Sequence, residues 1–322
     1  MDKKLSIVIA SRDDDYGNDP HEGIYDLDFT PLENIERTKI SIEKNLGLFE
    51  QNLDFDFEYI VVDWSPIDNK FLYKNPKLEN ILSDSHIKNI IVKPTSVEKL
   101  GLNPNGFHEY FAKNVGIRNS VGEYILILNS DGIMSKKIIK EINSVLKNNE
   151  KEYYFRPHSR IDIDPNYKKI AEGLSFYESQ HELNTLKKKL LDKSYNLDFK
   201  LDFTNKELST NPNFYNLIGT AAAGDFTMTH RDNMVETATG YFEDLKNLVD
   251  KNFRQTARDG QLLINLILHG VYPKKFRNSI EAFDHNKIER VGELKFRAYK
   301  NHVNWGFNNF EISKENENSY VI

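Results

Sequence analysis

The first half of the sequence alternates short apolar runs with segments of helical periodicity, and this leaves few folds open. The apolar runs span residues 5–10, 57–62, 87–92 and 124–128 and consist mainly of β-branched, aromatic and leucine residues. Runs of this length and composition are typical of buried strands. Apolar residues recur at roughly helical spacing within 31–51, 109–120 and 135–148. The alternation predicts an α/β fold with a doubly wound, mostly parallel sheet.

Three of the predicted strands end at polar residues. The first run is followed by Ser-Arg-Asp-Asp at 11–14, the second by Asp63, and the fourth by Asn-Ser-Asp-Gly at 129–132. In parallel α/β sheets, ligands collect at the carboxyl ends of the strands. We therefore expect these polar groups to lie side by side at one edge of the sheet. The same residues also fit ordinary strand-to-turn exits, so the pattern alone leaves both interpretations open.

The segment before the fourth strand adds cations to the predicted cluster. Lys113, Asn114 and Arg118 lie at helical spacing in residues 109–120, while Asp131 follows the strand. An acid, an amide and cations around one strand end are what a nucleotide diphosphate with a bound divalent metal requires. The sequence has neither a GxGxxG fingerprint nor a P-loop. The phosphates would therefore be held by a metal and cations and not by a glycine-rich loop.

Composition removes several other classes of protein. The chain has 322 residues, a net charge of −6 and no cysteine. Without cysteine there are no disulfides, thiol nucleophiles or cysteine zinc sites, and any metal must bind oxygen or histidine nitrogen. The charge gives no basic footprint for nucleic acid. No apolar run has the length of a transmembrane span, and we expect a cytoplasmic protein.

The second half is less regular. A strand is predicted at 153–156, helices at 231–241 and 258–269, and extended segments at 272–276 and 279–283. Residues 160–212 are polar, rich in lysine and weakly periodic, which indicates an insertion with a helix around 178–191. The tail from residue 290 is charged and rich in asparagine, and we expect its end to be frayed.

Four blocks of the sequence resemble those of GT-A glycosyltransferases, close to the family-2-like group of nucleotide-sugar transferases. They read LSIVIASRDDDYG, YIVVDWSP, AKNVGIRNSVGEYILILNSDG, and AAGDFTMTHRDNMVETATGYFED followed by ARDGQLLINLILHG. The blocks run in the family's order over about residues 5–285, and 160–212 is not covered. The resemblance implies a nucleotide-sugar-binding half at 1–150, an acceptor-binding α+β half at 151–290 and a C-terminal tail at 291–322.

The resemblance also implies roles for individual residues. Asp63 would accept a hydrogen bond from a base with a ring N–H, such as uracil. The remaining residues of the nucleotide-sugar site would be Ser11, Arg12, Asp14, Lys113, Asn114, Arg118, Asn129 and Ser130. Asp131 matches the last acid of the family's D-x-D motif and would bind Mn²⁺ or Mg²⁺, with His285 as a second ligand. Asn129 stands where the motif has its first acid, which leaves one carboxylate fewer for the metal.

On the acceptor side, the resemblance assigns Asp259 as the general base of an inverting transfer. A base is needed because the acceptor hydroxyl must lose its proton as it attacks the sugar. The same aspartate is also a good helix cap. Gly224, Asp225 and Glu243 would contact the acceptor or the sugar.

The implied activity is metal-dependent transfer of a sugar from a UDP- or GDP-sugar to a hydroxyl of a glycan or another acceptor. One alternative is a catalytically silent nucleotide-sugar-binding protein, which Asn129 keeps open. Another is a nucleotidyltransferase. It is disfavoured because residues 11–15 are acidic where such enzymes carry a glycine-rich phosphate loop.

Overall fold

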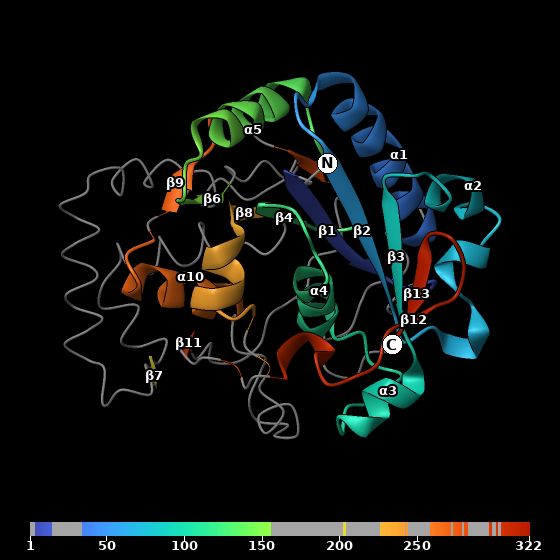
Figure 1. Ribbon diagram of the computed structural model, residues 1–322. Coiled ribbons are helices and arrows are strands. Elements are labelled where there is room, and N and C mark those ends of the chain that lie inside the picture. The colour runs from blue at the N-terminus through green and yellow to red at the C-terminus, as the bar shows by residue number, and fades with distance from the viewer. Residues whose placement is uncertain are drawn as a thin grey trace, which may run out of the picture.

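The protein is built around a nine-stranded sheet with helices on both faces (Figure 1). The computed structural model describes residues 4–14, 34–155, 202–203, 226–241, 243, 258–271, 273–278, 280–282, 296–297, 301 and 304–322. The strands lie in the order β12-β13-β3-β2-β1-β4-β8-β6-β9. Their bounds are β1 (Leu5–Ser11), β2 (Phe57–Trp64), β3 (Ile87–Val92), β4 (Tyr124–Leu128), β6 (Tyr153–Phe155), β8 (Phe226–His230), β9 (Pro273–Lys275), β12 (Ser313–Lys314) and β13 (Ser319–Val321).

The sheet is mostly parallel, as the sequence predicts. β13, β3, β2, β1 and β4 pair in parallel, and so do β6 and β9. Among the described strands of this sheet, β8 and β12 run in the opposite direction. Two small antiparallel pairs accompany the sheet: β5 (Gly132–Ile133) with β10 (Glu281–Ala282), and β7 (Asp202–Phe203) with β11 (Phe296–Arg297). The predicted α/β class with a large parallel sheet is confirmed.

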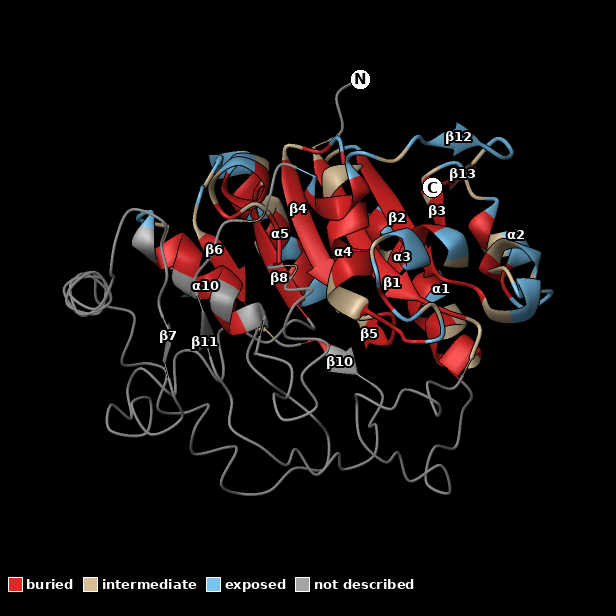
Figure 2. Ribbon diagram, turned by 90° about the horizontal axis from the view of Figure 1, so that it is seen from below, coloured by how far each residue is buried: buried red, intermediate tan, exposed pale blue. Residues whose placement is uncertain are grey.

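Helices cover both faces because the central strands are apolar on both sides. One core packs α1 (Asn34–Asn52), α2 (Glu79–Leu82) and α5 (Lys136–Asn148) against the odd-numbered side chains of β1. The other packs α3 (Pro94–Lys99), α4 (Glu109–Arg118) and α10 (Arg258–Leu268) on the opposite face. In Figure 2 the central strands are buried, and exposed residues lie on the outer helices, the loops and the edge strand β12. This is the doubly wound arrangement expected from strand–helix alternation.

Local signals in the sequence account for the ends of α5 and the close packing of α4. The Ser135 hydroxyl accepts a hydrogen bond from the Ile138 amide at 3.4 Å, which caps α5, and Asn149 ends the helix in the left-handed conformation. Gly116 faces β1 and β2, where a Cβ would overlap Val8 and approach Val62 Cγ2 to 3.2 Å. The absence of a side chain therefore lets α4 lie directly on the sheet.

Two predictions for the second half of the chain need correction. Helix 231–241 is mainly a π-helical turn, η5 (Asn233–Thr237), followed by Gly240 with φ +69°. The end of the tail is not frayed: β13 pairs with β3, and Ile322 is 5% exposed. The apolar residues of Ser319–Ile322 explain this, because they cover the open edge of β3. The helix predicted around 178–191 lies outside the described residues. No helix in the described part has the length and apolarity to cross a membrane.

Candidate functional site at the carboxyl edge of the sheet

The polar residues after β1, β2 and β4 lie at the same edge of the sheet. Ser11, the last residue of β1, pairs with Asp63 of β2, and Val8 pairs with Ile127 of β4. The same register continued by three residues places Ser130 level with Ser11. Neighbouring strands are about 4.8 Å apart, so the three strand ends form one continuous polar edge. This arrangement was the expectation from the sequence.

Asp63 is a buried carboxylate with one oxygen left open. It is 2% exposed, and its Oδ2 accepts a hydrogen bond from the Leu72 amide at 2.8 Å. Its Oδ1 has no hydrogen-bond partner in the described part of the chain. Burial raises the pKa of Asp63 to about 7, and the negative charges of Asp13 and Asp14 add to this, whereas the Leu72 amide and Arg12 oppose it. Asp63 can thus accept or donate a hydrogen bond near neutral pH.

The loop after β2 is bent around this carboxylate. Ser65, Asp68 and Asn69 all have positive φ, at 48°, 52° and 58°. The left-handed region is unfavourable for residues other than glycine, with Asn and Asp the most tolerant of it. The bend carries the chain back so that the amide of Leu72 points at Asp63. Strain of this kind is typical of functional sites, where the surrounding structure offsets its cost.

Arg12 forms the other wall beside Asp63. The side chain is almost fully buried, and its guanidinium pairs with Asp14 at 2.5 Å and donates to the Asn105 carbonyl at 3.1 Å. It also lies over the ring of Phe107, 5.7 Å from the centroid. Arg12 therefore fixes the loop before α4 to the end of β1.

Lys113 connects α4 to the end of β4. Its side chain is 1% exposed, and its ammonium group donates to Asn129 Oδ1 at 2.8 Å and pairs with Glu109 Oε1 at 2.5 Å. The position of Asn129 thus holds a neutral acceptor for a lysine whose charge is already balanced by Glu109. This explains in physical terms why an amide can stand where the resemblance expects an acid.

Asp131 follows β4 at the point where the β5–β10 pair begins. It is 5% exposed, and the next residue, Gly132, pairs with Ala282 at the end of β10. Asn45 of α1 fixes this corner: its amide donates to the Gly132 carbonyl at 2.7 Å and accepts from the Met134 amide at 2.8 Å. The structure therefore brings β10, from the second half of the chain, next to Asp131. His285 itself lies outside the described residues.

One carboxylate at this corner is compatible with Mg²⁺ or Mn²⁺. Such hard cations take oxygen ligands, and Mg²⁺ commonly keeps several waters and substrate phosphates next to one or two carboxylates. Asp131 would hold the ion. Asn129 Oδ1 is engaged by Lys113 and does not face a metal while that bond holds.

Several predicted site residues lie away from this edge. Asn114 is fully buried. Its Nδ2 donates to the Tyr241 carbonyl at 2.6 Å and to Glu243 Oε1 at 2.9 Å, and its Oδ1 accepts from the Tyr241 amide at 2.8 Å. Glu243 additionally accepts from the Gly306 amide at 2.9 Å. These two residues join α4 to the backbone at Tyr241 and at Gly306.

Arg118 is at the other end of α4, beside the amino ends of the strands. Its guanidinium lies over Trp305, 5.0 Å from the ring centroid, and donates to Asn308 at 3.2 Å. The structure does not bring it to the polar edge. Asp259 lies in the first turn of α10, and its side chain is outside the description. Gly224 and Asp225 also lie outside the described residues.

Sequence reasoning missed two residues that shape the edge, Glu109 and Asn105. Glu109 could have been found, because its i,i+4 spacing to Lys113 is the usual signature of an ion pair on a helix. Asn105 contacts Arg12 through its backbone carbonyl. A main-chain contact of this kind leaves no signal in the side-chain sequence.

Comparisons with models of protein families and with curated proteins gave no match. Solved structures similar to this chain include TarS 1-349 of S. aureus in complex with UDP-GlcNAc, at 13% identity and a TM-score of 0.46, over 88% of this chain and 59% of that one. Another is the mannosyltransferase PcManGT of Pyrobaculum calidifontis in complex with GDP-Man and Mn²⁺, at 9% identity and a TM-score of 0.45, over 90% and 59%. The chain thus spans less than two thirds of either protein.

Proposed function

We propose that this protein is a glycosyltransferase that takes a sugar from a nucleotide-diphosphate donor bound at the carboxyl edge of the sheet. The observation that carries the proposal is Asp63, a buried carboxylate at a strand end with its Oδ1 unpaired in the described chain. An unpaired buried oxygen is costly unless a ligand satisfies it. A base with a ring N–H, as in uracil or guanine, supplies a donor of the right kind.

The rest of the edge supports a nucleotide in a defined orientation. Arg12 and Lys113 are held rigidly by ion pairs with Asp14 and Glu109. With the base at Asp63, the ribose and diphosphate would extend past Ser11 toward Asp131, along the register of β2, β1 and β4. This path ends where β5 meets β10, so that the sugar would face the acceptor-side half.

The metal and base assignments complete the proposed reaction. Asp131, with His285, would bind Mn²⁺ or Mg²⁺, which would stabilise the charge of the departing diphosphate. Asp259 would take the proton of the acceptor hydroxyl as that oxygen attacks the anomeric carbon, with inversion of configuration. It lies in the first turn of α10, which packs in the same core as α4.

The test is calorimetric binding of UDP, GDP and their sugars to the full chain, with Mn²⁺ and then with EDTA. We expect one nucleotide to bind in a metal-dependent manner, with binding lost in Asp131→Asn. Asp63→Asn should abolish the preference between bases, because an amide places a donor where the ring N–H needs an acceptor. Asp54→Asn, an exposed acid before β2, is the matched control. Binding that persists unchanged in both site variants would refute the proposal.

A catalytically silent nucleotide-sugar-binding protein is the second candidate, which Asn129 keeps open. Because Asn129 stands where the motif has its first acid, the metal has one motif carboxylate fewer. Release of nucleotide in the presence of a sugar acceptor separates the two candidates. Turnover that is lost in Asp259→Asn, with donor binding retained, would support the transferase and its base; turnover that survives would remove Asp259 from that role.

A further inference from the structure

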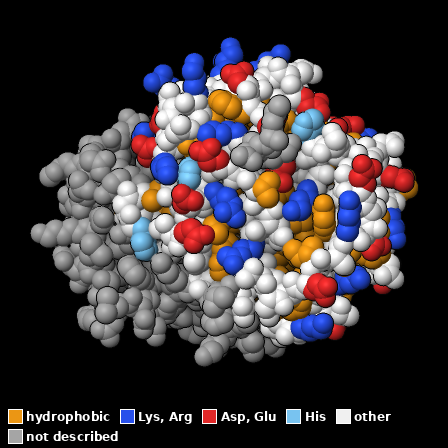
Figure 3. All heavy atoms as spheres, viewed as in Figure 1, with side chains coloured by type: hydrophobic (Ala, Val, Ile, Leu, Met, Phe, Trp, Pro, Cys, Tyr) orange, Lys and Arg blue, Asp and Glu red, His pale blue; other side chains and the backbone are white. Residues whose placement is uncertain are grey.

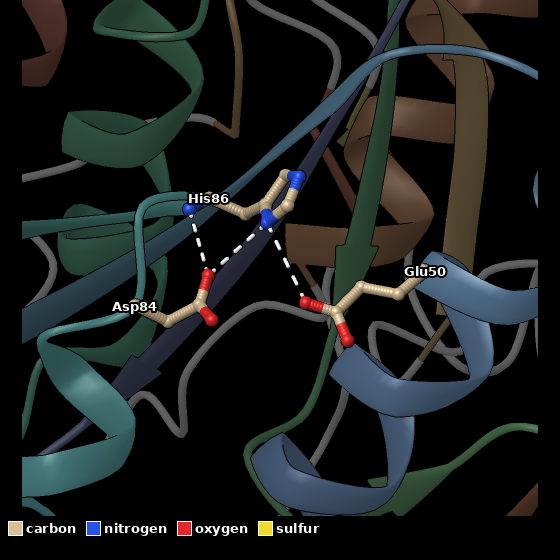
Figure 4. Close-up of side chains that lie close together, drawn as sticks. All are labelled: Glu50, Asp84 and His86. Carbon is tan, nitrogen blue, oxygen red and sulfur yellow. Dashed lines mark hydrogen bonds and ion pairs between the residues drawn. The ribbon is translucent and has the colours of Figure 1, made fainter.

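A second group of potential metal ligands lies at the opposite edge of the sheet from the proposed nucleotide site. Glu50 near the end of α1, Asp84 after α2 and His86 before β3 place one ligand atom each within 4.8 Å of one another (Figure 4). Within the residues that the structure describes, no other group of three His, Asp or Glu side chains does so. The three come from separate elements, so the cluster is a product of the fold and not of local sequence.

The imidazole of His86 is held in a defined orientation. It stacks on Phe57 of β2 with the ring centroids 4.6 Å apart and the planes 8° from parallel. Phe57 in turn packs against Phe49, the neighbour of Glu50, at 5.6 Å between centroids. The aromatic stack therefore fixes both the plane of the imidazole and the turn of α1 that carries Glu50. In this orientation Nδ1 points at both carboxylates (Figure 4).

Asp84 is fixed as well. Its Oδ1 accepts a hydrogen bond from the His86 backbone amide at 2.8 Å and lies 3.1 Å from Nδ1. Glu50 Oε1 lies 3.6 Å from the same nitrogen. In a tetrahedral site with bonds of about 2.0–2.2 Å, neighbouring ligand atoms are roughly 3.3–3.6 Å apart. Both distances to Nδ1 are close to that spacing. The Glu50 side chain is partly exposed and can move to bring its carboxylate to the same distance from that of Asp84.

We propose that Glu50, Asp84 and His86 form a binding site for a transition-metal dication of the zinc type. One imidazole nitrogen and two carboxylate oxygens are ligands that Zn²⁺, Co²⁺ and Ni²⁺ accept, whereas Mg²⁺ and Ca²⁺ prefer oxygen alone. The three side chains are 40%, 30% and 35% exposed in the order Glu50, Asp84 and His86. An ion can therefore enter from solvent, and a water molecule completes the fourth position.

The metal would join α1 to the turn that starts β3, at the edge remote from the nucleotide. It would act as a structural clamp, because an ion that binds only the folded chain stabilises it by mass action. A plain ion pair of His86 with the two carboxylates is the alternative. It predicts no metal dependence of stability and no spectroscopic signature of coordinated imidazole.

The experiment is titration of the full chain with Co²⁺ and Zn²⁺, followed by calorimetry and by the visible absorption of Co²⁺, in the Asp131→Asn background. That background keeps the proposed nucleotide-site metal out of the measurement. We expect one Zn²⁺ per chain, a tetrahedral Co²⁺ spectrum that Zn²⁺ abolishes, and a higher unfolding midpoint with Zn²⁺ than with EDTA.

Variants of the ligands decide the assignment. His86→Phe keeps an aromatic ring on Phe57 but removes the nitrogen. It should weaken Zn²⁺ binding by at least about 10–100-fold, which is the loss that follows even from removing an outer-shell partner. Asp84→Asn keeps an acceptor for the His86 amide and should weaken binding without unfolding the turn. Glu43→Gln, an exposed acid elsewhere on α1, should bind as the parent does. Equal Zn²⁺ affinity in His86→Phe, or no Zn²⁺ binding by the parent, overturns the proposal.

Discussion

Asp63→Asn gives the sharpest test of the buried carboxylate, because its effect on the free energy of unfolding should change with pH in a direction that the raised pKa fixes. Burial raises the pKa of Asp63 from 3.8 to about 7. At pH well below the ordinary pKa of 3.8, the group is protonated in both the folded and the unfolded chain. As pH rises to about 7, the unfolded chain ionises first, so the folded state loses stability. The loss is about 1.4 kcal/mol for each unit of pKa difference, or about 4 kcal/mol in total for the roughly three units here.

The asparagine variant removes this titration and should be free of that loss. Its free energy of unfolding, minus that of the parent, should therefore rise by about 4 kcal/mol between pH 4 and pH 8. The new amide leaves a buried N–H₂ beside Leu72, which shifts the whole difference by about 1–3 kcal/mol but not its slope. Urea unfolding followed by circular dichroism at several pH values measures the difference directly.

Other titrating groups are common to both proteins and cancel in the difference. Asp54→Asn, at an exposed position, should give a flat difference within about 0.5 kcal/mol. A flat profile for Asp63→Asn as well would refute the reasoning, because it would mean that Asp63 is as well solvated in the folded chain as in the unfolded one. The range is measurable, since typical domains are stable by about 5–15 kcal/mol.

The helices α4 and α1 give further predictions. Gly116→Ala should destabilise the fold by about 1–3 kcal/mol, because the new Cβ overlaps Val8 in a packed core. Gly47→Ala in α1 has nothing within 4 Å of the new Cβ and should stabilise by about 0.5–1 kcal/mol in the same thermal unfolding assay. Asn114→Ala should cost about 1–3 kcal/mol of unfolding free energy for each buried group it leaves unpaired. Protease cleavage near Tyr241 should also become faster, because Asn114 binds the backbone there. Unchanged cleavage would mean that Asn114 does not hold this segment in place.

The sequence was a good guide wherever local pattern and burial agree. β4 was predicted to the residue and α5 to within one residue, since a short apolar run and an amphipathic stripe each have one dominant interpretation. The prediction of a parallel sheet also implied that Asp63 and Ser11 lie side by side at the ends of their strands. The direction of β8 could not be predicted, because its antiparallel pairing with β4 depends on partners about 100 residues apart in the chain.

Side-chain direction was the harder part of the candidate site. Asn114 and Lys113 are adjacent in the sequence, yet on a helix they point about 100° apart. Lys113 consequently contacts Asn129 at the polar edge, while Asn114 binds the backbone of Tyr241. A sequence motif contains both residues but does not tell which one faces the proposed ligand and which one holds the scaffold together. The contacts in the structure make that distinction.

The pairing of β13 with β3 has a consequence for how the protein is made. β3 emerges from the ribosome well before its neighbour Ser319–Val321, which follows more than 200 residues later, since Ser319 pairs with Asn89. Until then the β3 edge presents unpaired amide and carbonyl groups, which is a template for adhesion to other nascent chains. Cells that express this protein should therefore depend on chaperones during synthesis. A truncation before residue 313 should form inclusion bodies even though β1, β2 and β4 are intact.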